Sequence, residues 1–414
     1  MNIKKILALL LVGMLLISLA GCGANQPAPK EEPKKAEGKY KDGIYFAQED
    51  DFSKKSGWKA VVTIEVKDGK IAKVDWNGAH KSGGPSKKDF SKLGQYPMVE
   101  QGGAKAPWHE QAAKAEAYLI EKQDPSAITY KEDNYKSDDI AGVTIGVSPL
   151  FKLAEKALAN GPVGSGKYKD GAYYSQDPGY SKNYKYSASL TVINGYIVAA
   201  EWNGYNVNGG KDKKTLSADG EYQMVAKGGA KAEWHEQAAI AEAFLLEKQD
   251  PTITYKEDKY HTDDIAGVSI GVSPFFKNAE AALAKGPIAQ GPYVDGIFYS
   301  AQENFSEKTG WKYNVQVAVK NGRIVGVDWT GTHKDGGDDK DTLSAKGEYN
   351  MVAKGGAQAE WHEQAAKVEA FLLEKQDPTA VTYDDAGKTD DIAGATIGVG
   401  DFFKLVEAVV KKVK

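Results

Sequence analysis

The stretch Trp58–Trp76, which reads WKAVVTIEVKDGKIAKVDW, decides the fold of this chain. Apolar and polar residues alternate along it as far as Val66, and this period of two is typical of a β-strand with one buried face. Asp68-Gly69 is a strong signal for a tight hairpin turn. On the return strand, one face is expected to carry Ala72, Val74 and Trp76. The stretch therefore predicts an antiparallel hairpin.

The hairpin belongs to a unit that occurs three times. Trp76, Trp202 and Trp329 recur at intervals of 126 and 127 residues, each on the strand that follows a turn signal. A unit of this length is sufficient for a core of its own, and short stretches rich in Gly and Pro separate the copies. Three tandem domains are therefore expected, over residues 39–160, 167–286 and 292–413.

The rest of the first copy mixes a further strand with helices. A first strand is expected over 40–47, a helix over 107–122, a short strand over 128–130, and a second helix that begins with Ser148 as N-cap and Pro149 as its first residue. Residues 77–103 give no clear prediction. The pattern favours an α+β fold in three tandem copies, each with an antiparallel sheet and packed helices.

Each copy also contains a run in which a hydroxyl residue closely follows a glycine. In the first copy it reads Asp138-Asp139-Ile140-Ala141-Gly142-Val143-Thr144, and matching runs occupy 263–269 and 390–396. The side-chain hydroxyl is the one reactive group that the three runs share. The candidate site residues are Asp138, Asp263 and Asp390, Gly142, Gly267 and Gly394, and Thr144, Ser269 and Thr396.

Hydrolytic and metal chemistry fit these runs poorly. Gly267–Gly271 nearly matches a nucleophile elbow, but that motif needs a parallel sheet and a histidine base with its own acid. His109 lies in a Trp-His-Glu-Gln-Ala-Ala segment that recurs in every copy, yet no second histidine follows four residues later, as a zincin requires. Two interpretations remain for this histidine: it is satisfied at a helix start, or it walls a planar ligand together with the tryptophan before it. No metal site is expected.

The N-terminus has the pattern of an exported lipoprotein. Lys4 and Lys5 precede an apolar run that is too short to span a membrane, and Leu19-Ala20-Gly21-Cys22 resembles the lipobox of bacterial lipoproteins. The resemblance implies a signal peptide over 1–21, cleavage before Cys22 and acylation of its sulfur. Residues 22–38 are expected to form a disordered tether, which would hold the protein on the outer side of the cell membrane.

Composition excludes several classes of protein. Cys22 is the only cysteine, so disulfides, c-type haem and cysteine-ligated iron–sulfur or zinc sites are excluded. The chain has 53 basic and 57 acidic residues, a formal charge of −4, and this balance does not favour nucleic-acid binding.

Taken together, these motifs resemble the FMN-binding domain family. Its members are the flavinyl-acceptor domains of Rnf- and Nqr-type electron-transfer subunits and of exported lipoproteins, including multi-domain lipoproteins of Gram-positive extracellular electron transfer. The likeness rests on Asp42-Gly43, on Lys67–Lys70 at the hairpin turn and on the triple hydroxyl run. The runs depart from the family motif, because alanine replaces its serine in all three copies and valine replaces its alanine in the first two.

The resemblance implies a covalent cofactor. In the family, a threonine carries FMN through a phosphoester bond that a magnesium-dependent ApbE-type flavin transferase makes from FAD. Carried over to this chain, the acceptors are Thr144, Thr396 and Ser269, which allows up to three FMN groups. The protein would then be an electron carrier rather than an enzyme, and it would accept electrons from a membrane-side donor and pass them to an extracellular acceptor.

Two alternatives remain open at the level of sequence. The first is an extracellular lipoprotein that binds a ligand such as a sugar through its many aromatic residues. The second is a structural surface antigen whose domains serve as spacers. Neither has a redox role.

Overall fold

The computed structural model describes residues 38–132 and 135–412. The expected signal peptide, Cys22 and all of the tether except Gly38 lie outside these residues. Within the described residues, no helix has both the length and the apolar character needed to cross a membrane.

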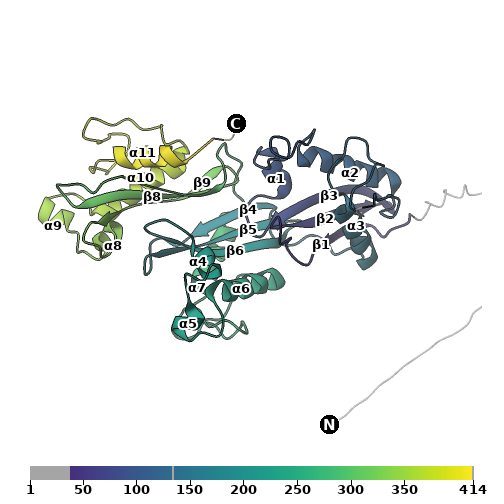
Figure 1. Cartoon of the computed structure of the whole chain (residues 1–414), viewed down its shortest axis with the longest axis horizontal. Coiled ribbons are helices and arrows are strands. Elements are labelled where there is room, and N and C mark those ends of the chain that lie inside the picture. Colours follow the sequence, from purple (N-terminus) through teal and green to yellow (C-terminus); the bar gives the residue numbers. More distant parts are fainter. Residues whose placement is uncertain (1–37, 133–134, 413–414) are drawn as a thin grey trace, which may run out of the picture. The chain divides into compact units, whose positions relative to one another are not determined.

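A three-stranded antiparallel sheet occurs in each copy, with the strands in chain order (Figure 1). The strands of the first copy are β1 (Gly43–Gln48), β2 (Trp58–Lys67) and β3 (Lys70–His80). Those of the second are β4 (Gly171–Gln176), β5 (Tyr184–Ile193) and β6 (Tyr196–Asn206). Those of the third are β7 (Gly296–Ala301), β8 (Trp311–Lys320) and β9 (Arg323–His333).

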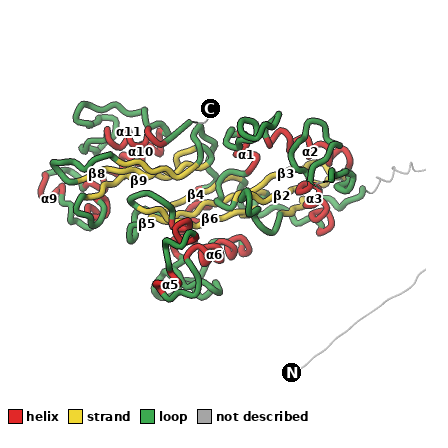
Figure 2. The backbone as a smooth tube through the Cα atoms, viewed as in Figure 1, coloured by secondary structure: helices red, strands yellow, loops and turns green. Residues whose placement is uncertain are grey.

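Helices follow the strands in every copy, as the tube view shows (Figure 2). The first copy has α1 (Lys87–Lys92), α2 (Trp108–Lys122) and α3 (Ser148–Asn160). The second has α4 (Lys213–Ala218), α5 (Met224–Gly228), α6 (Trp234–Lys248) and α7 (Ser273–Lys285). The third has α8 (Lys340–Ala345), α9 (Met351–Gly355), α10 (Trp361–Lys375) and α11 (Gly400–Val409). The predicted α+β fold in three copies is confirmed.

The predicted hairpin forms, with one correction on its return strand. Asp68 and Gly69 both have positive φ, 53° and 70°, as a two-residue turn of the hairpin type requires. A bulge shifts the pairing, so that Val66 faces Ile71 while Glu65 faces Lys73. Ala72 is the extra residue of this bulge and is exposed, so its predicted place on the buried face is wrong.

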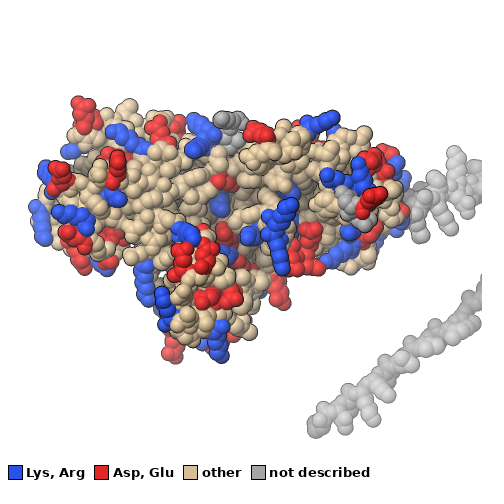
Figure 3. Space-filling view, in the orientation of Figure 1, with Lys and Arg blue, Asp and Glu red and all other residues tan. Residues whose placement is uncertain are grey.

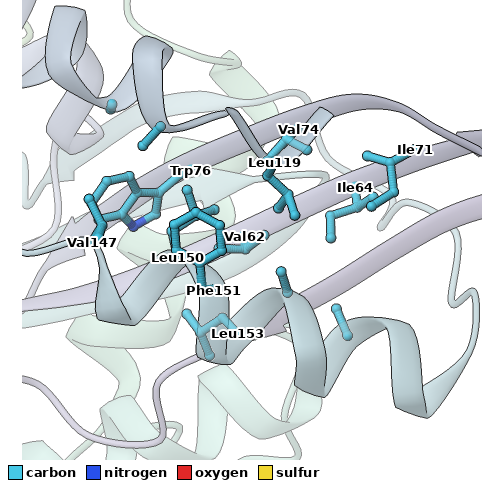
Figure 4. Packing of buried hydrophobic residues seen from close by; sticks show 14 of the residues in the cluster. Val62, Ile64, Ile71, Val74, Trp76, Leu119, Val147, Leu150, Phe151 and Leu153 are labelled. Carbon is cyan, nitrogen blue, oxygen red and sulfur yellow. The ribbon is translucent and has the colours of Figure 1, made fainter. Parts of the chain in front are cut away.

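The core of the first copy lies between the sheet and two helices (Figure 4). The predicted stripe of α2 is buried, and it consists of Trp108, Ala112, Ala115 and Leu119. Leu150 and Phe151 of α3 are fully buried in the same cluster, together with Ile64 of β2. The other two copies have equivalent clusters.

Two predictions in the loops are wrong. Residues 128–130 do not form a strand, because the backbone N–H of Thr129 donates to the side chain of Asp139, at 2.7 Å, instead of to a neighbouring strand. Ser148 is the first residue of α3 rather than its N-cap, a position that Val147 takes with helical dihedral angles. The stretch 77–103, which gave no prediction, contains α1 with Ser86 as its N-cap.

A buried acid ties the long helix of each copy to the sheet. Glu116 Oε1 accepts from the backbone N–H of Trp76 at 2.6 Å and lies 2.6 Å from Lys88 Nζ. The second copy repeats this arrangement with Glu242 and Lys214. In the third copy, Asp341 stands at the position of these lysines.

Candidate functional site

The three hydroxyl residues occupy the same local structure. Thr144, Ser269 and Thr396 are exposed and lie in the loops before α3, α7 and α11. The backbone N–H of Thr144 donates to Gln111 Oε1 at 2.7 Å, and its hydroxyl donates to the same oxygen at 3.2 Å. Ser269 and Thr396 make the same two contacts with Gln237 and Gln364. Each hydroxyl is therefore held in place while remaining open to solvent.

The glutamine that holds the hydroxyl comes from the long helix and is itself fixed. Gln111 is only 1% exposed, and its Nε2 donates to the backbone oxygen of Ala106 at 2.8 Å. Its Oε1 also accepts from the backbone N–H of Ile145 at 3.3 Å. Sequence reasoning missed this residue, although its signal was present as the glutamine of the recurring Trp-His-Glu-Gln-Ala-Ala segment.

The glycines of the runs adopt a backbone conformation that other residues rarely take. Gly142, Gly267 and Gly394 have φ of +74°, +83° and +77°. A Cβ on Gly142 would come within 2.8 Å of Lys114 Nζ. The turn that presents the hydroxyl therefore depends on glycine for its dihedral angle, because the lysine end can move aside.

The paired acids stabilise the loop rather than face the hydroxyl. Asp138 and Asp263 are exposed and lie 2.6 and 2.7 Å from Lys131 and Lys256, and Asp390 is exposed as well. The second acid of each pair accepts from a backbone N–H at 2.7 Å, and these acids are Asp139, Asp264 and Asp391. The contacts of these acids therefore stabilise the conformation of the loop.

A cavity of about 390 Å³ lies beside Thr144 in the first copy. Its lining includes Thr144 itself and the aromatic side chains of Trp58, Tyr96 and Trp108. These residues come from β2, from the segment after α1 and from the start of α2. The size suits a small ligand, and the walls combine aromatic faces with a few polar groups.

A lysine in an aromatic cage lines the same cavity, and sequence reasoning did not find it. Lys87 Nζ lies 4.8 to 5.6 Å from the ring centroids of Trp58, Tyr96 and Trp108. The other copies repeat the cage: Lys213 faces Tyr184, Tyr186, Tyr222 and Trp234, and Lys340 faces Trp311, Tyr313, Tyr349 and Trp361. Each lysine is the first residue of a short helix.

These caged lysines lack a carboxylate partner. Across residues 38–132 and 135–412, no ion pair joins Lys87, Lys213 or Lys340 to an acid. Burial is the largest influence on all three, and it lowers the pKa of each ammonium from 10.5 to about 8. Glu49 opposes this effect at Lys87, and Lys182 adds to it at Lys213.

A buried donor without an acceptor lies next to each cage. The indole N–H groups of Trp76, Trp202 and Trp329 are buried and have no hydrogen-bond acceptor among the described residues. Trp76 lines the cavity and packs edge-on against Trp108, with ring centroids 5.1 Å apart. Buried N–H groups normally find a partner, so these three indoles are exceptions that recur at the same place in each copy.

The recurring histidines are satisfied within each copy. His109 Nδ1 lies 2.9 Å from Ser91 Oγ, and His235 and His362 make the same contact with Ser217 and Ser344. His109 does not line the cavity, whereas Trp108 does. The histidine therefore follows the first interpretation, in which it is satisfied by a local hydrogen bond. Only the tryptophan forms part of the cavity wall.

Surface charges and potential metal ligands of the described residues do not point to a second site. The face in Figure 3 carries Lys, Arg, Asp and Glu side chains interspersed over the described residues. In the same part of the chain, no cluster of three or more His, Cys, Asp or Glu side chains has the arrangement to hold a metal ion.

Comparison with known proteins gives two similar structures. No family model and no curated protein matches the chain. A Clostridium thermocellum protein with a solution NMR structure is 57% identical over 29% of this chain and 91% of its own, with a TM-score of 0.24. The crystal structure of the CPE2226 protein from Clostridium perfringens is 30% identical over 29% of this chain and 88% of its own, with a TM-score of 0.23.

Proposed function

We propose that this protein is a membrane-anchored, extracellular electron carrier with FMN esterified to Thr144, Ser269 and Thr396. The observation that carries the proposal is the exposed hydroxyl on a turn built the same way in each copy, which in the first copy lies beside an aromatic-lined cavity. Three equivalent alcohols, each fixed by a buried glutamine, suit a single modification repeated along the chain.

The surroundings of the hydroxyl suit an acceptor that another protein modifies. In the described part of the chain, the only hydrogen bonds of the three hydroxyls are to glutamine oxygens, which are weak bases. The phosphoester bond would form between the hydroxyl oxygen and the phosphate of FMN, with AMP leaving from FAD. An ApbE-type transferase would supply the base and the magnesium ion, and FAD would supply the electrophilic phosphorus.

The aromatic walls of the cavity would suit the flat ring of a flavin. When bound, FMN would supply reversible uptake of electrons at that ring. The chain would contribute Trp58, Tyr96 and Trp108 as aromatic walls and the linkage as a permanent tether. A covalent bond keeps the local concentration of the cofactor fixed outside the cell, where a free flavin would be diluted.

Electrons would enter from a membrane-side donor and leave to an extracellular acceptor. Acylation of Cys22 would hold the chain at the membrane, and the tether would give the folded copies reach. The chain would make no bond in a substrate of its own.

Mass spectrometry tests the proposal directly. The chain is produced with an ApbE-type transferase in flavin-replete cells, and its intact mass is compared with that of the chain made alone. The account expects up to three FMN additions. An unmodified mass, under conditions that modify a known acceptor domain, would contradict it.

A non-covalent binding protein is the second candidate. The aromatic walls of the cavity would also suit the face of a sugar ring. This candidate predicts a colourless protein after native purification and quenching of tryptophan fluorescence by the ligand. Yellow protein that keeps its colour after denaturation and gel filtration would exclude it.

A further inference from the structure

The caged lysines lower the stability of the folded protein, so a role in folding does not explain their presence. Lys213 and Lys340 are 5% and 3% exposed. Burial of an ammonium group without a carboxylate is costly, and cation–π contacts offset only part of the cost. Each lysine also stands at the N-terminal end of a helix, where positive charge is disfavoured. A lysine nevertheless stands at this place in all three copies, half-buried in the first copy and buried in the other two.

The position of the lysine relative to the hydroxyl suggests the reason. In the first copy, Lys87 and Thr144 line one cavity, so a group bound to the hydroxyl at one side can meet the ammonium at another. Trp76 belongs to the same lining through its indole ring, while its N–H is itself buried. A lysine that lines this cavity without an ion-pair partner indicates a ligand that is rich in acceptor atoms or negative charge.

We propose that Lys87, Lys213 and Lys340 bind the acceptor-rich end of the flavin ring and stabilise the negative charge that the ring gains on reduction. This inference rests on the proposed function. Oxidised flavin takes up two electrons and one proton, and the reduced ring then carries one negative charge. The electrons come from the membrane-side donor, or from dithionite in the experiment. The lysine stays protonated throughout and supplies the opposite charge.

The lysine of the first copy lacks a contact that its two counterparts make. Lys213 Nζ and Lys340 Nζ each donate to a tyrosine hydroxyl at 2.7 Å, those of Tyr186 and Tyr313. The matching residue of β2 is Ala60, which lines the cavity. Lys87 therefore lacks this phenol acceptor, and the first copy is the best place for a test.

The main experiment measures the midpoint potential of the first flavin alone. Ser269→Ala and Thr396→Ala leave Thr144 as the single acceptor in the full chain. In this background, Lys87→Met is expected to move the potential to a more negative value, and Lys87→Arg to keep it near that of the parent. Lys122→Met removes an exposed charge from the same copy and is expected to have no effect. Equal potentials for Lys87→Met and Lys122→Met would overturn the inference.

A second measurement does not depend on the covalent bond. Riboflavin has no phosphate and cannot be esterified, so its fluorescence reports binding of the ring to chain made without the transferase. Loss of a charged hydrogen bond predicts that Lys87→Met binds riboflavin at least roughly tenfold more weakly than the parent chain. Unchanged binding in that variant would contradict a role for the lysine.

The two measurements separate the failures. If intact mass shows no FMN but riboflavin binds and depends on Lys87, the proposed linkage fails and the ring site stands. If FMN attaches and neither potential nor riboflavin affinity responds to Lys87→Met, the linkage stands and the lysine is only structural. Circular dichroism of each variant confirms that it is folded.

Discussion

Single residues determine whether the hydroxyl is presented. One oxygen of Gln364 accepts from the backbone N–H groups of Thr396 and Ile397 and from the threonine hydroxyl. Its amide group donates to Ala359 at 2.9 Å. Four contacts of one buried side chain thus join the start of α10 to the hydroxyl run.

We expect Gln364→Ala to lower both stability and flavin attachment in the third copy. The change leaves the backbone N–H groups of Thr396 and Ile397 without their acceptor, at about 0.5–1.5 kcal/mol for each lost hydrogen bond. Thermal unfolding and intact mass check the two effects, with Glu374→Ala at an exposed position of α10 as the control. Full attachment to Thr396 in a chain of unchanged stability would show that the glutamine does not hold the run.

Removal of the caged Lys340 is expected to raise the free energy of unfolding. Burial lowers the pKa of Lys340 from 10.5 to about 8, so between these values the unfolded state binds more protons than the folded state. The free energy of unfolding should therefore rise with pH across this window, and below it the buried charge costs up to about 3 kcal/mol. Lys340→Met should raise stability at neutral pH and flatten the rise. Urea unfolding of unflavinylated protein measures both, and a destabilised variant would contradict this account.

At the scale of elements, the sequence predicts what periodicity controls and misses what tertiary contacts control. The hairpin and the buried stripe of α2 follow from periods of 2 and 3.6. Ala72 is misplaced because a bulge depends on the pairing of β2 with β3. The strand expected at 128–130 is absent because Asp139 takes its backbone donor. The cage of Lys87 unites three segments that only the folded chain brings together.

The buried ion pair of the second copy joins three elements and gives a test at this scale. Glu242 on α6 bonds to the backbone of β6 and to Lys214 on α4. Glu242→Leu should destabilise this copy by about 1–3 kcal/mol, because it removes the acceptor of the Trp202 backbone N–H and the partner of the half-buried Lys214. The double variant Glu242→Leu with Lys214→Met should recover much of the loss. Denaturant unfolding of both variants checks the order, and a double variant less stable than the single one would contradict it.

At the scale of the whole molecule, the proposed function would place one cofactor on each of the three copies. The hydroxyl, its glutamine and the caged lysine recur in each copy with nearly the same distances. Thr396→Ala is therefore expected to remove one FMN equivalent and leave the other two copies loaded. The ratio of flavin absorbance to protein reports this stoichiometry, and loss of all flavin from the variant would show that the copies are not independent acceptors.

The central claim is a covalent flavin on the alcohol of each copy, and peptide mapping of protein from its own cells tests it most directly. Tryptic peptides that contain Thr144, Ser269 and Thr396 are expected to carry the mass of FMN and to fluoresce. If these three peptides are recovered in full and none is modified, the account is contradicted.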